Sequence, residues 1–248
     1  MPFLTDRNSI IELLRSNPAQ AGTLWIEAGH ERVLEELIAE AKRCGARFRV
    51  VSREEFARRF KGMRTHMVLE RGVFSSLDPD ALLARIRSTA RPFLAAFDGI
   101  SDPQNLGNAL RSAACLALDA LILPKDRSCS VTDTVSRVSR GAAEHVSVVR
   151  VTNLHRMLEE LKRANIFCYG LEEQAGKNLW ELDLTIPLCL VFGKEEGMRR
   201  LTRETCDEIV RIPTAAGFST LNVATSFAIS AYEVVRQRWK SQIPISKR

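Results

Sequence analysis

The feature that most limits the fold is a recurrence of short apolar runs along the later part of the chain. Segments in which apolar residues have helical spacing separate these runs. Runs of this length fit buried strands better than helices. Strands that alternate with helices in this way predict a mainly parallel sheet covered on both faces. We therefore expect an α/β fold, whose strands are residues 92–97, 120–124, 146–151, 166–171, 188–192 and 208–212.

The first part of the chain predicts a smaller α/β unit. Turn-forming residues gather between positions 75 and 80 and are followed by a short helical stretch, which is typical of a linker. We expect a small domain over residues 1–75, a linker over 76–91 and the larger domain over 92–248. The strands and helices expected in the small domain are residues 23–28, 32–44, 47–51, 53 onward and 66–69.

The composition is that of an ordinary globular chain. It has 248 residues, of which 45% are hydrophobic, and this is enough to bury a core. No apolar stretch approaches the roughly 20 residues that cross a bilayer, and no secretory signal opens the chain. The six cysteines form no C-x-x-C pair, and the four histidines are scattered. We therefore expect a cytoplasmic protein with reduced thiols, no membrane association and no metal centre.

The net charge of +6 suits a polyanionic partner, which basic side chains bind through phosphate contacts. Two basic clusters in the first domain are candidates for contacts to an RNA backbone. A solvated surface explains them equally well. The main cluster consists of Arg58, Arg59, Lys61 and Arg64, and the second of Arg43, Arg47 and Arg49.

Three polar loops follow expected strands, where parallel sheets bind their ligands. The first runs from Asp98 to Arg111, and on local grounds Asn105 is simply an N-cap asparagine and Arg111 a surface arginine. The second is the turn Gly193-Lys-Glu195-Glu-Gly197, where glycine lets the backbone approach a ligand closely. No G-x-G-x-x-G follows a strand, so a Rossmann-type nucleotide site is not expected.

The third loop, residues 212–223, is the least ordinary of the three. Small, hydroxyl and amide side chains stand at the start of an apolar helix. A hydroxyl explains the helix cap, but Asn222 is then left as a polar group in the first turn. Either the backbone or a ligand must satisfy it.

Taken in order and at their spacing, these loops resemble the motifs of the SPOUT superfamily, specifically the TrmH-like RNA ribose 2′-O-methyltransferases. The resemblance covers residues 92–240 almost continuously, and the first 75 residues resemble the family's L30e-like substrate-binding domain. The resembling segments are Asp98-Gly-Ile-Ser-Asp-Pro-Gln-Asn-Leu-Gly, Pro124-Lys-Asp-Arg-Ser128, Gly141-Ala-Ala-Glu144, Arg150-Val-Thr-Asn153, Gly197-Met-Arg-Arg-Leu-Thr-Arg-Glu204 and Tyr232-Glu-Val-Val-Arg-Gln-Arg238.

The resemblance implies a deep trefoil knot in the larger domain, a homodimer formed through that domain, and S-adenosylmethionine as methyl donor. It implies methylation of a guanosine ribose in 23S rRNA. The same chemistry on tRNA or another rRNA site is the alternative, and so is a non-catalytic protein for RNA binding or ribosome assembly. The implied cofactor contacts are Gly193, Ile212 and Leu221. The implied catalytic residues are Arg111, Asn105, Glu195, Ser219, Thr220 and Asn222.

Arg111 is the principal catalytic residue that the resemblance implies. A guanidinium with a pKa above about 12 stays protonated, so it is a poor general base. We expect Arg111 to bind the adjacent phosphate and to stabilise the developing alkoxide. The proton then passes to water, to a phosphate oxygen or to Glu195.

Overall fold

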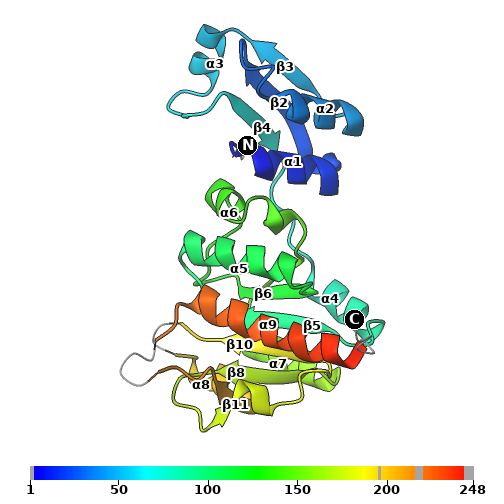
Figure 1. The fold of residues 1–248 in the computed structure, drawn as a ribbon, viewed down its shortest axis with the longest axis vertical. Helices are drawn as coiled ribbons and strands as arrows, with labels where there is room; N and C mark the ends of the chain where they lie inside the picture. Colours follow the sequence, from blue (N-terminus) through cyan, green and yellow to red (C-terminus); the bar gives the residue numbers. More distant parts are fainter. Residues whose placement is uncertain (1–2, 195–196, 216–219, 243–248) are drawn as a thin grey trace, which may run out of the picture. The chain divides into compact units, whose positions relative to one another are not determined.

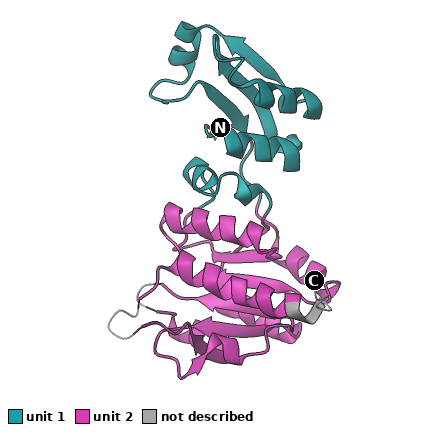
Figure 2. Cartoon of the chain, in the orientation of Figure 1, with its two compact units in different colours: residues 1–75, 130–145 teal, residues 76–129, 146–248 magenta. Residues whose placement is uncertain are grey.

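The structure is a computed structural model that describes residues 3–194, 197–215 and 220–242. The chain divides into two units (Figure 2). The first consists of Met1–Ser75 and Ser130–His145, and the second of Ser76–Cys129 and Val146–Arg248. Each unit has its own sheet.

The sheet of the second unit has seven strands in the order β7-β6-β5-β10-β8-β11-β9, and all of its pairings are parallel. Every residue of β5, β6 and β10 is buried, which explains their unbroken apolar sequences. The expected α/β fold with a mainly parallel sheet is confirmed, and the trefoil knot stays a prediction. The strands are β5 (Phe93–Phe97), β6 (Ala120–Pro124), β7 (Val148–Val151), β8 (Phe167–Leu171), β9 (Lys177–Asn178), β10 (Leu188–Phe192) and β11 (Glu208–Arg211).

Helices α5 (Pro103–Cys115) and α9 (Val223–Gln242) lie side by side over the sheet (Figure 1). Three aromatic rings join this layer to the strands beneath it. Phe227 of α9 lies 5.7 Å, centroid to centroid, from both Phe97 and Phe192, at the ends of β5 and β10. This packing places the starts of both helices at the carboxyl edge of the sheet.

The alternate residues of the same strands face a second core. There Leu94, Ile122 and Val191 pack with apolar residues of α4 (Pro79–Arg87) and α7 (Leu154–Arg163). The period-2 alternation of strand side chains divides each buried strand between the two cores. Helix α8 (Arg200–Thr205) and a short 3-10 turn, η3 (Leu179–Glu181), complete the described elements of this unit.

Residues 76–91 differ from the linker that the sequence suggested. Asp78 caps α4 by accepting hydrogen bonds from the backbone of Asp80 and Ala81. The helix buries Leu82 and Ile86, four residues apart, in the core of the second unit. The turn formers at 75–80 therefore mark a helix start rather than a free connection.

The first unit has a four-stranded mixed sheet in the order β1-β4-β2-β3. Strands β2 and β3 are parallel, and β4 pairs antiparallel with both β1 and β2. Apolar residues of α1 and α2 cover the sheet on one side, and an aromatic group that includes Phe56 of α3 packs on Trp25. The elements are β1 (Phe3–Leu4), α1 (Arg7–Ser16), η1 (Pro18–Gln20), β2 (Ala21–Glu27), α2 (Glu35–Cys44), β3 (Phe48–Val51), α3 (Arg53–Arg59) and β4 (Met67–Arg71).

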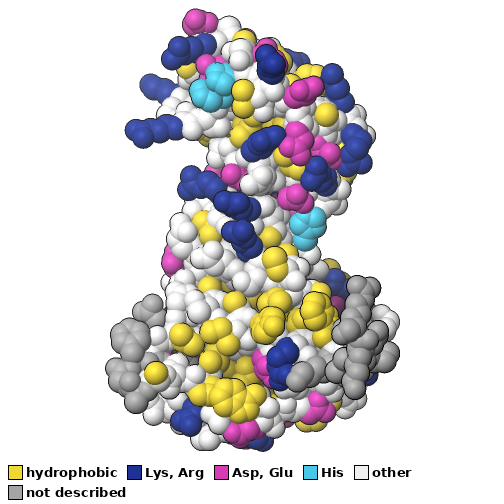
Figure 3. Space-filling view, in the orientation of Figure 1, with side chains coloured by type: hydrophobic (Ala, Val, Ile, Leu, Met, Phe, Trp, Pro, Cys, Tyr) yellow, Lys and Arg dark blue, Asp and Glu magenta, His cyan; other side chains and the backbone are white. Residues whose placement is uncertain are grey.

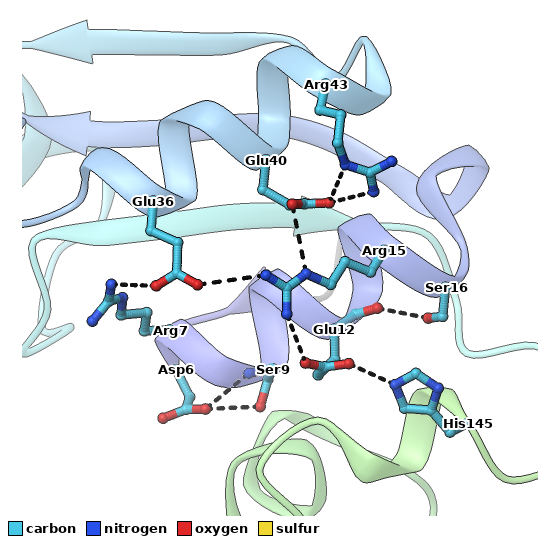
Figure 4. Close-up of polar contacts among 10 residues, drawn as sticks. All are labelled: Asp6, Arg7, Ser9, Glu12, Arg15, Ser16, Glu36, Glu40, Arg43 and His145. Atoms are coloured by element: carbon cyan, nitrogen blue, oxygen red, sulfur yellow. Dashed lines mark hydrogen bonds and ion pairs between the residues drawn. The ribbon is translucent and has the colours of Figure 1, made fainter.

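Charged side chains bridge α1 and α2 on the surface of this unit (Figure 4). The Arg15 guanidinium lies 3.6 Å from the Glu12 carboxylate, 3.4 Å from that of Glu36 and 3.5 Å from that of Glu40. The Arg15 side chain is 44% exposed, so water screens these pairs and each contributes little. They add to a helix pair that the apolar core already holds together.

Residues 130–145 lie between two stretches of the second unit along the chain, but they pack in the first unit. They form α6 (Asp133–Val138) and the 3-10 turn η2 (Ala142–Glu144). The Asp133 carboxylate accepts hydrogen bonds from the backbone and hydroxyl of Thr5, each at 3.0 Å. Gly141 has a φ of +82°, and a Cβ there would lie 2.7 Å from the Cβ of Glu12, so only glycine fits.

A buried ion pair completes this packing. Arg71, the last residue of β4, lies 2.9 Å from the Glu144 carboxylate, and both side chains are only 3% exposed. Burial lowers the pKa of Arg71 and raises the pKa of Glu144, because both charged forms have lost their water. Each charge is tolerated only because the other is present.

Two further expectations from the sequence concern the cysteines and membrane association. All six cysteines are free thiols, and burial raises the pKa of Cys206 to about 12. Over the part of the chain that the structure describes, no helix combines the length and apolarity needed to span a membrane.

The first prediction concerns the buried pair. We expect Arg71→Ala to lower the free energy of unfolding of the first unit by about 3–5 kcal/mol, because it leaves a buried carboxylate without a partner. Arg71→Met combined with Glu144→Leu removes both charges and is expected to recover most of that loss. Urea unfolding can be followed by Trp25 fluorescence in a Trp180→Phe, Trp239→Phe background, since these are the other two tryptophans of the sequence.

The surface substitution Arg7→Ala is the control for this experiment. Arg7 pairs with Glu36 while 44% exposed, and its loss is expected to cost about 0–1 kcal/mol. If Arg71→Ala costs no more than Arg7→Ala, the buried pair does not hold residues 130–145 in the first unit.

Candidate active site

The ends of β5 and β10 are fixed side by side by their register. Phe97 pairs with Phe192, so Asp98 and Gly193 leave the sheet next to each other. The backbone N–H of Asp98 donates to the carbonyl of Phe192 at 2.8 Å and extends the ladder by one bond. The first and second loops of the sequence therefore begin at the same point of the carboxyl edge.

Asp98 ties the second loop to this point. Its carboxylate, 1% exposed, accepts a hydrogen bond from the backbone N–H of Arg199 at 2.8 Å and another from the Arg199 Nε at 2.7 Å. The Arg199 Nη2 donates to the same carboxylate. These bonds raise the pKa of Arg199 above its ordinary value. The buried carboxylate thus closes the loop between β10 and α8.

Gly193 is required by the loop itself. A Cβ at this position would lie 2.5 Å from the carbonyl carbon of Gly197 and 2.5 Å from the backbone nitrogen of Met198. The backbone N–H of Lys194 donates to the carbonyl of Gly197 at 3.1 Å, and the N–H of Gly197 donates to the carbonyl of Lys194 at 2.9 Å. The close approach that the sequence suggested for Gly193 is therefore an approach of the chain to itself.

Asn222 joins the third loop to the first. Its side-chain oxygen accepts a hydrogen bond from the backbone N–H of Ala224 at 2.9 Å and so caps α9. Its amide Nδ2 donates to the Oδ1 of Asn105 at 2.8 Å. The Asn222 side chain, whose partner the sequence did not identify, is satisfied by both the backbone of α9 and the side chain of Asn105. Asn105 lies in the first turn of α5, whose cap is Asp102.

Arg111 lies further along α5 and is exposed. Within the described chain, its guanidinium makes no hydrogen bond or ion pair. It therefore differs from Arg199, which Asp98 holds. An exposed arginine that has no partner among the described residues is available to an anionic ligand.

The remaining predicted residues lie as follows. Ile212 directly follows β11, at the same edge of the sheet, and is half-buried. Thr220 and Leu221 immediately precede Asn222, Thr220 exposed and Leu221 half-buried. Glu195 and Ser219 lie outside the described residues. The structure thus brings Asn105 and Asn222 into contact, and Gly193 and Ile212 directly follow β10 and β11.

The backbone at three of these positions is open. The N–H and C=O groups of Gly193, Ile212 and Leu221 make no hydrogen bond to any other described residue. Backbone polar groups at partly buried positions require a partner, and a ligand can supply one. They fit a ligand that has several donors and acceptors, as the adenosylmethionine expected from the sequence has.

Asp98 and Arg199 are the functional residues that sequence reasoning missed. The sequence signal that could have found them is that Asp98 directly follows a wholly apolar strand. A carboxylate in apolar surroundings needs a partner, because burying an unpaired charge costs free energy. Its partner stands about a hundred residues later in the chain, and no local pattern connects the two.

This fold and site define an RNA methyltransferase class: the chain belongs to the SpoU rRNA methylase family, whose model matches residues 92–232. A second model, RNA 2′-O ribose methyltransferase substrate binding, matches residues 7–68. The family expected from the three loops is confirmed.

Among individual relatives, the chain is similar to the 23S rRNA (guanosine-2′-O-)-methyltransferase RlmB of Yersinia pestis. The two are 38% identical over 234 residues, which cover 93% of this chain and 95% of the relative. The protein of the same name from Pseudomonas aeruginosa is also 38% identical, over 93% of this chain and 94% of its own.

Solved structures show the same fold. The SpoU methyltransferase AviRb from Streptomyces viridochromogenes, in complex with the cofactor AdoMet, superposes with a TM-score of 0.77 at 23% identity. The match covers 96% of this chain and 90% of AviRb. An AdoMet-bound rRNA methyltransferase from Sinorhizobium meliloti superposes with a TM-score of 0.74 at 17% identity, over 94% and 86% of the two chains.

The second prediction concerns Asp98. We expect Asp98→Ala to free the loop after β10, because the backbone N–H of Arg199 loses its buried acceptor, and to cost about 1–3 kcal/mol of stability in the second unit. Hydrogen exchange followed by mass spectrometry checks this: peptides that contain Arg199 should exchange faster. Asp80→Ala, which removes an exposed carboxylate of the same unit, is the control. Equal exchange in the two variants would show that Asp98 does not hold the loop.

Proposed function

We propose that the protein transfers a methyl group from S-adenosylmethionine to the ribose 2′-hydroxyl of a guanosine in 23S rRNA, in the cytoplasm. The contact between Asn105 and Asn222 is the observation that carries the proposal, because it joins two sequence-distant loops, and Asn105 belongs to the same helix as the exposed Arg111. Family membership supports the reaction class, and the printed name of the 38% identical relatives supports the RNA.

Methyl transfer requires that the protein assist the ribose 2′-oxygen, which is a weak nucleophile while it is protonated. The 2′-hydroxyl must lose its proton as it attacks, and negative charge develops on the oxygen. The cofactor supplies the electrophilic methyl group and a neutral leaving group. Arg111, permanently charged, binds the neighbouring phosphate and stabilises the alkoxide. The proton passes to water, to a phosphate oxygen or to Glu195.

Asn105 and Asn222 orient the ribose in this proposal. Asn222 uses its oxygen on the cap of α9 and its amide on Asn105, so its side chain is fixed at both ends. The Asn105 amide nitrogen donates to no other described residue and is free to donate to a ribose or phosphate oxygen. Holding the hydroxyl in line with the methyl group lowers the barrier by up to about 7–11 kcal/mol in favourable systems. Thr220 and Ser219 belong to the same proposed site.

The cofactor contacts in this proposal are the backbone groups of Gly193, Ile212 and Leu221. All three stand where the loops leave the sheet or enter α9. Asp98 acts at a distance, because it holds Arg199, which lies a few residues after Gly193, against the end of β5.

A homodimer formed through the second unit is part of the same proposal. Helix α9 presents Ile229, Tyr232 and Trp239 with 41%, 60% and 64% of their surfaces exposed. Figure 3 shows hydrophobic side chains gathered over this region. An apolar face of this kind on a helix marks an interface. Sedimentation equilibrium should give twice the mass of one chain; the mass of one chain would contradict the dimer.

The third prediction is of the reaction itself. The full chain should transfer labelled methyl groups from S-adenosylmethionine to 23S rRNA from cells that lack the enzyme, and mapping should place them on a guanosine ribose. We expect Arg111→Ala to lose about 10²–10³-fold in rate, the loss typical of one electrostatic donor, and Arg111→Lys to lose less. Arg163→Ala, an exposed arginine on α7, is the matched control.

Other outcomes distinguish the alternatives. Methyl groups on tRNA or on another rRNA site would replace the proposed substrate and keep the chemistry. Cofactor binding without any transfer would identify a non-catalytic RNA-binding protein. Near-full activity of Arg111→Ala would remove Arg111 from the reaction.

We also propose that the first unit binds RNA through Arg58, Lys61 and Arg64, which are exposed. Arg59, the fourth residue of this predicted cluster, has a structural role. Its guanidinium lies 3.8 Å from the centroid of the Trp25 ring and 3.3 Å from the Glu70 carboxylate. Neutralising Arg59 would therefore disturb the sheet as well as the charge.

The fourth prediction is that replacing Arg58, Lys61 and Arg64 together by alanine weakens RNA binding at low salt. Each lost phosphate contact should reduce the slope of log K against log salt by about 0.7–0.9. Filter binding of 23S rRNA fragments across salt concentrations measures both quantities. A matched triple variant in the second unit, Arg87→Ala, Arg156→Ala and Arg163→Ala, is the control. Equal slopes in the two triple variants would dismiss the patch.

A further inference from the structure

Three potential metal ligands meet at one end of the sheet in the first unit. Glu27 ends β2, His30 lies in the turn that follows, and His66 directly precedes β4. The antiparallel pairing of β2 with β4 sets these points together, and the backbone N–H of Glu27 donates to the carbonyl of His66 at 2.9 Å. A nitrogen of each imidazole and a carboxylate oxygen all lie within 4.8 Å of one another.

The two imidazoles have an unusual arrangement. Their rings stack at 3.7 Å between centroids with an interplanar angle of 11°. The His66 Nδ1 lies 2.9 Å from the Glu27 carboxylate, whereas the His30 Nδ1 is buried and makes no hydrogen bond to the described chain. A buried ring nitrogen without a partner costs free energy, and a metal ion is a partner that satisfies it.

We propose that Glu27, His30 and His66 form a binding site for a divalent transition-metal ion, with Zn²⁺ as the ion that fits best. Two imidazole nitrogens and one carboxylate oxygen are a donor set that zinc accepts in tetrahedral geometry, with water in the fourth position. Imidazole donors favour such ions over Mg²⁺ or Ca²⁺, which prefer oxygen.

The surroundings leave room for the ion. The stacked rings must turn about their side-chain bonds so that both lone pairs converge on one point. The His66 side chain is 59% exposed, and a cavity of about 340 Å³ lined by Glu27, Thr65 and His66 opens beside it. The Arg53 guanidinium, 3.8 Å from Glu27, is 87% exposed and moves into water when the cation binds.

Binding would tie the turn after β2 to the start of β4. The segment before His66 carries Lys61 and Arg64, so the ion would also order the basic segment of the first unit. No metal centre was expected from the sequence, because His66 follows His30 by 36 positions. The strand pairing removes that separation.

The fifth prediction is tested by calorimetric titration of Zn²⁺ into the full chain, freed of metal by a chelator and carrying no histidine tag. One ion per chain is expected. His30→Ala, His66→Gln and Glu27→Gln should each weaken binding by tenfold or more, in the range of about 10–100-fold that even outer partners of a metal contribute. His66→Gln keeps a polar side chain beside Glu27, and circular dichroism checks that each variant is folded.

His145→Ala is the matched control. His145 also lies against a carboxylate in the first unit, with its Nε2 2.6 Å from Glu12 (Figure 4), but among the described rings only His30 and His66 stack as a histidine pair. Binding should be unchanged in this variant. Zinc binding that none of the three substitutions weakens, or no stoichiometric binding at all, would overturn the proposal.

Titration with Co²⁺ identifies the donor atoms. A site of nitrogen and oxygen donors gives visible ligand-field bands without the near-ultraviolet charge-transfer band of a thiolate. This result supports the proposed ligands. A thiolate band that disappears in Cys115→Ser, the exposed cysteine, would assign the metal to that thiol instead and overturn the proposal.

Discussion

The parallel register between β5 and β10 is the constraint on which the candidate active site depends. It ends both strands at the same level, so that Asp98 and Gly193 leave the sheet together. The buried Asp98 carboxylate then holds the loop after β10 through Arg199. A shift of this register by one residue would set the ends of the two strands at different levels, so Asp98 and Gly193 would no longer leave the sheet together. The core that fixes the register therefore also fixes the loop.

The sheet can hold this register because each buried strand serves two cores. Leu94 and Val191 face the layer of α4 and α7, while Phe97 and Phe192 face Phe227 of α9. The second contact matters for the site, since α9 begins at the cap residue Asn222. Packing of Phe227 on the strand ends brings Asn222 to the first turn of α5, where it meets Asn105. Aromatic packing and a polar contact thus support the same geometry.

The first unit depends on residues that come from two parts of the chain. Its sheet and helices α1 to α3 come from the first 75 residues, and α6 with η2 returns to it after β6. Arg71 and Glu144 hold the two parts together as a buried ion pair. The turn formers at 75–80 predicted a linker over residues 76–91 and a domain boundary near residue 90. Long-range packing assigned α4 to the second unit and residues 130–145 to the first.

The sequence by itself determined the fold class, six of the seven strands of the larger unit and the family, because short apolar runs and ordered loop motifs are local properties of the chain. The two-residue strand β9 has no apolar run and was not predicted. The sequence also placed Asn105 and Asn222 near the starts of helices that follow strands. Only the tertiary structure decided that Asn222 contacts Asn105, that Asp98 holds Arg199 and that His30 stacks on His66. Those partners lie far apart in sequence, and strand register and helix packing, rather than any local pattern, bring them together.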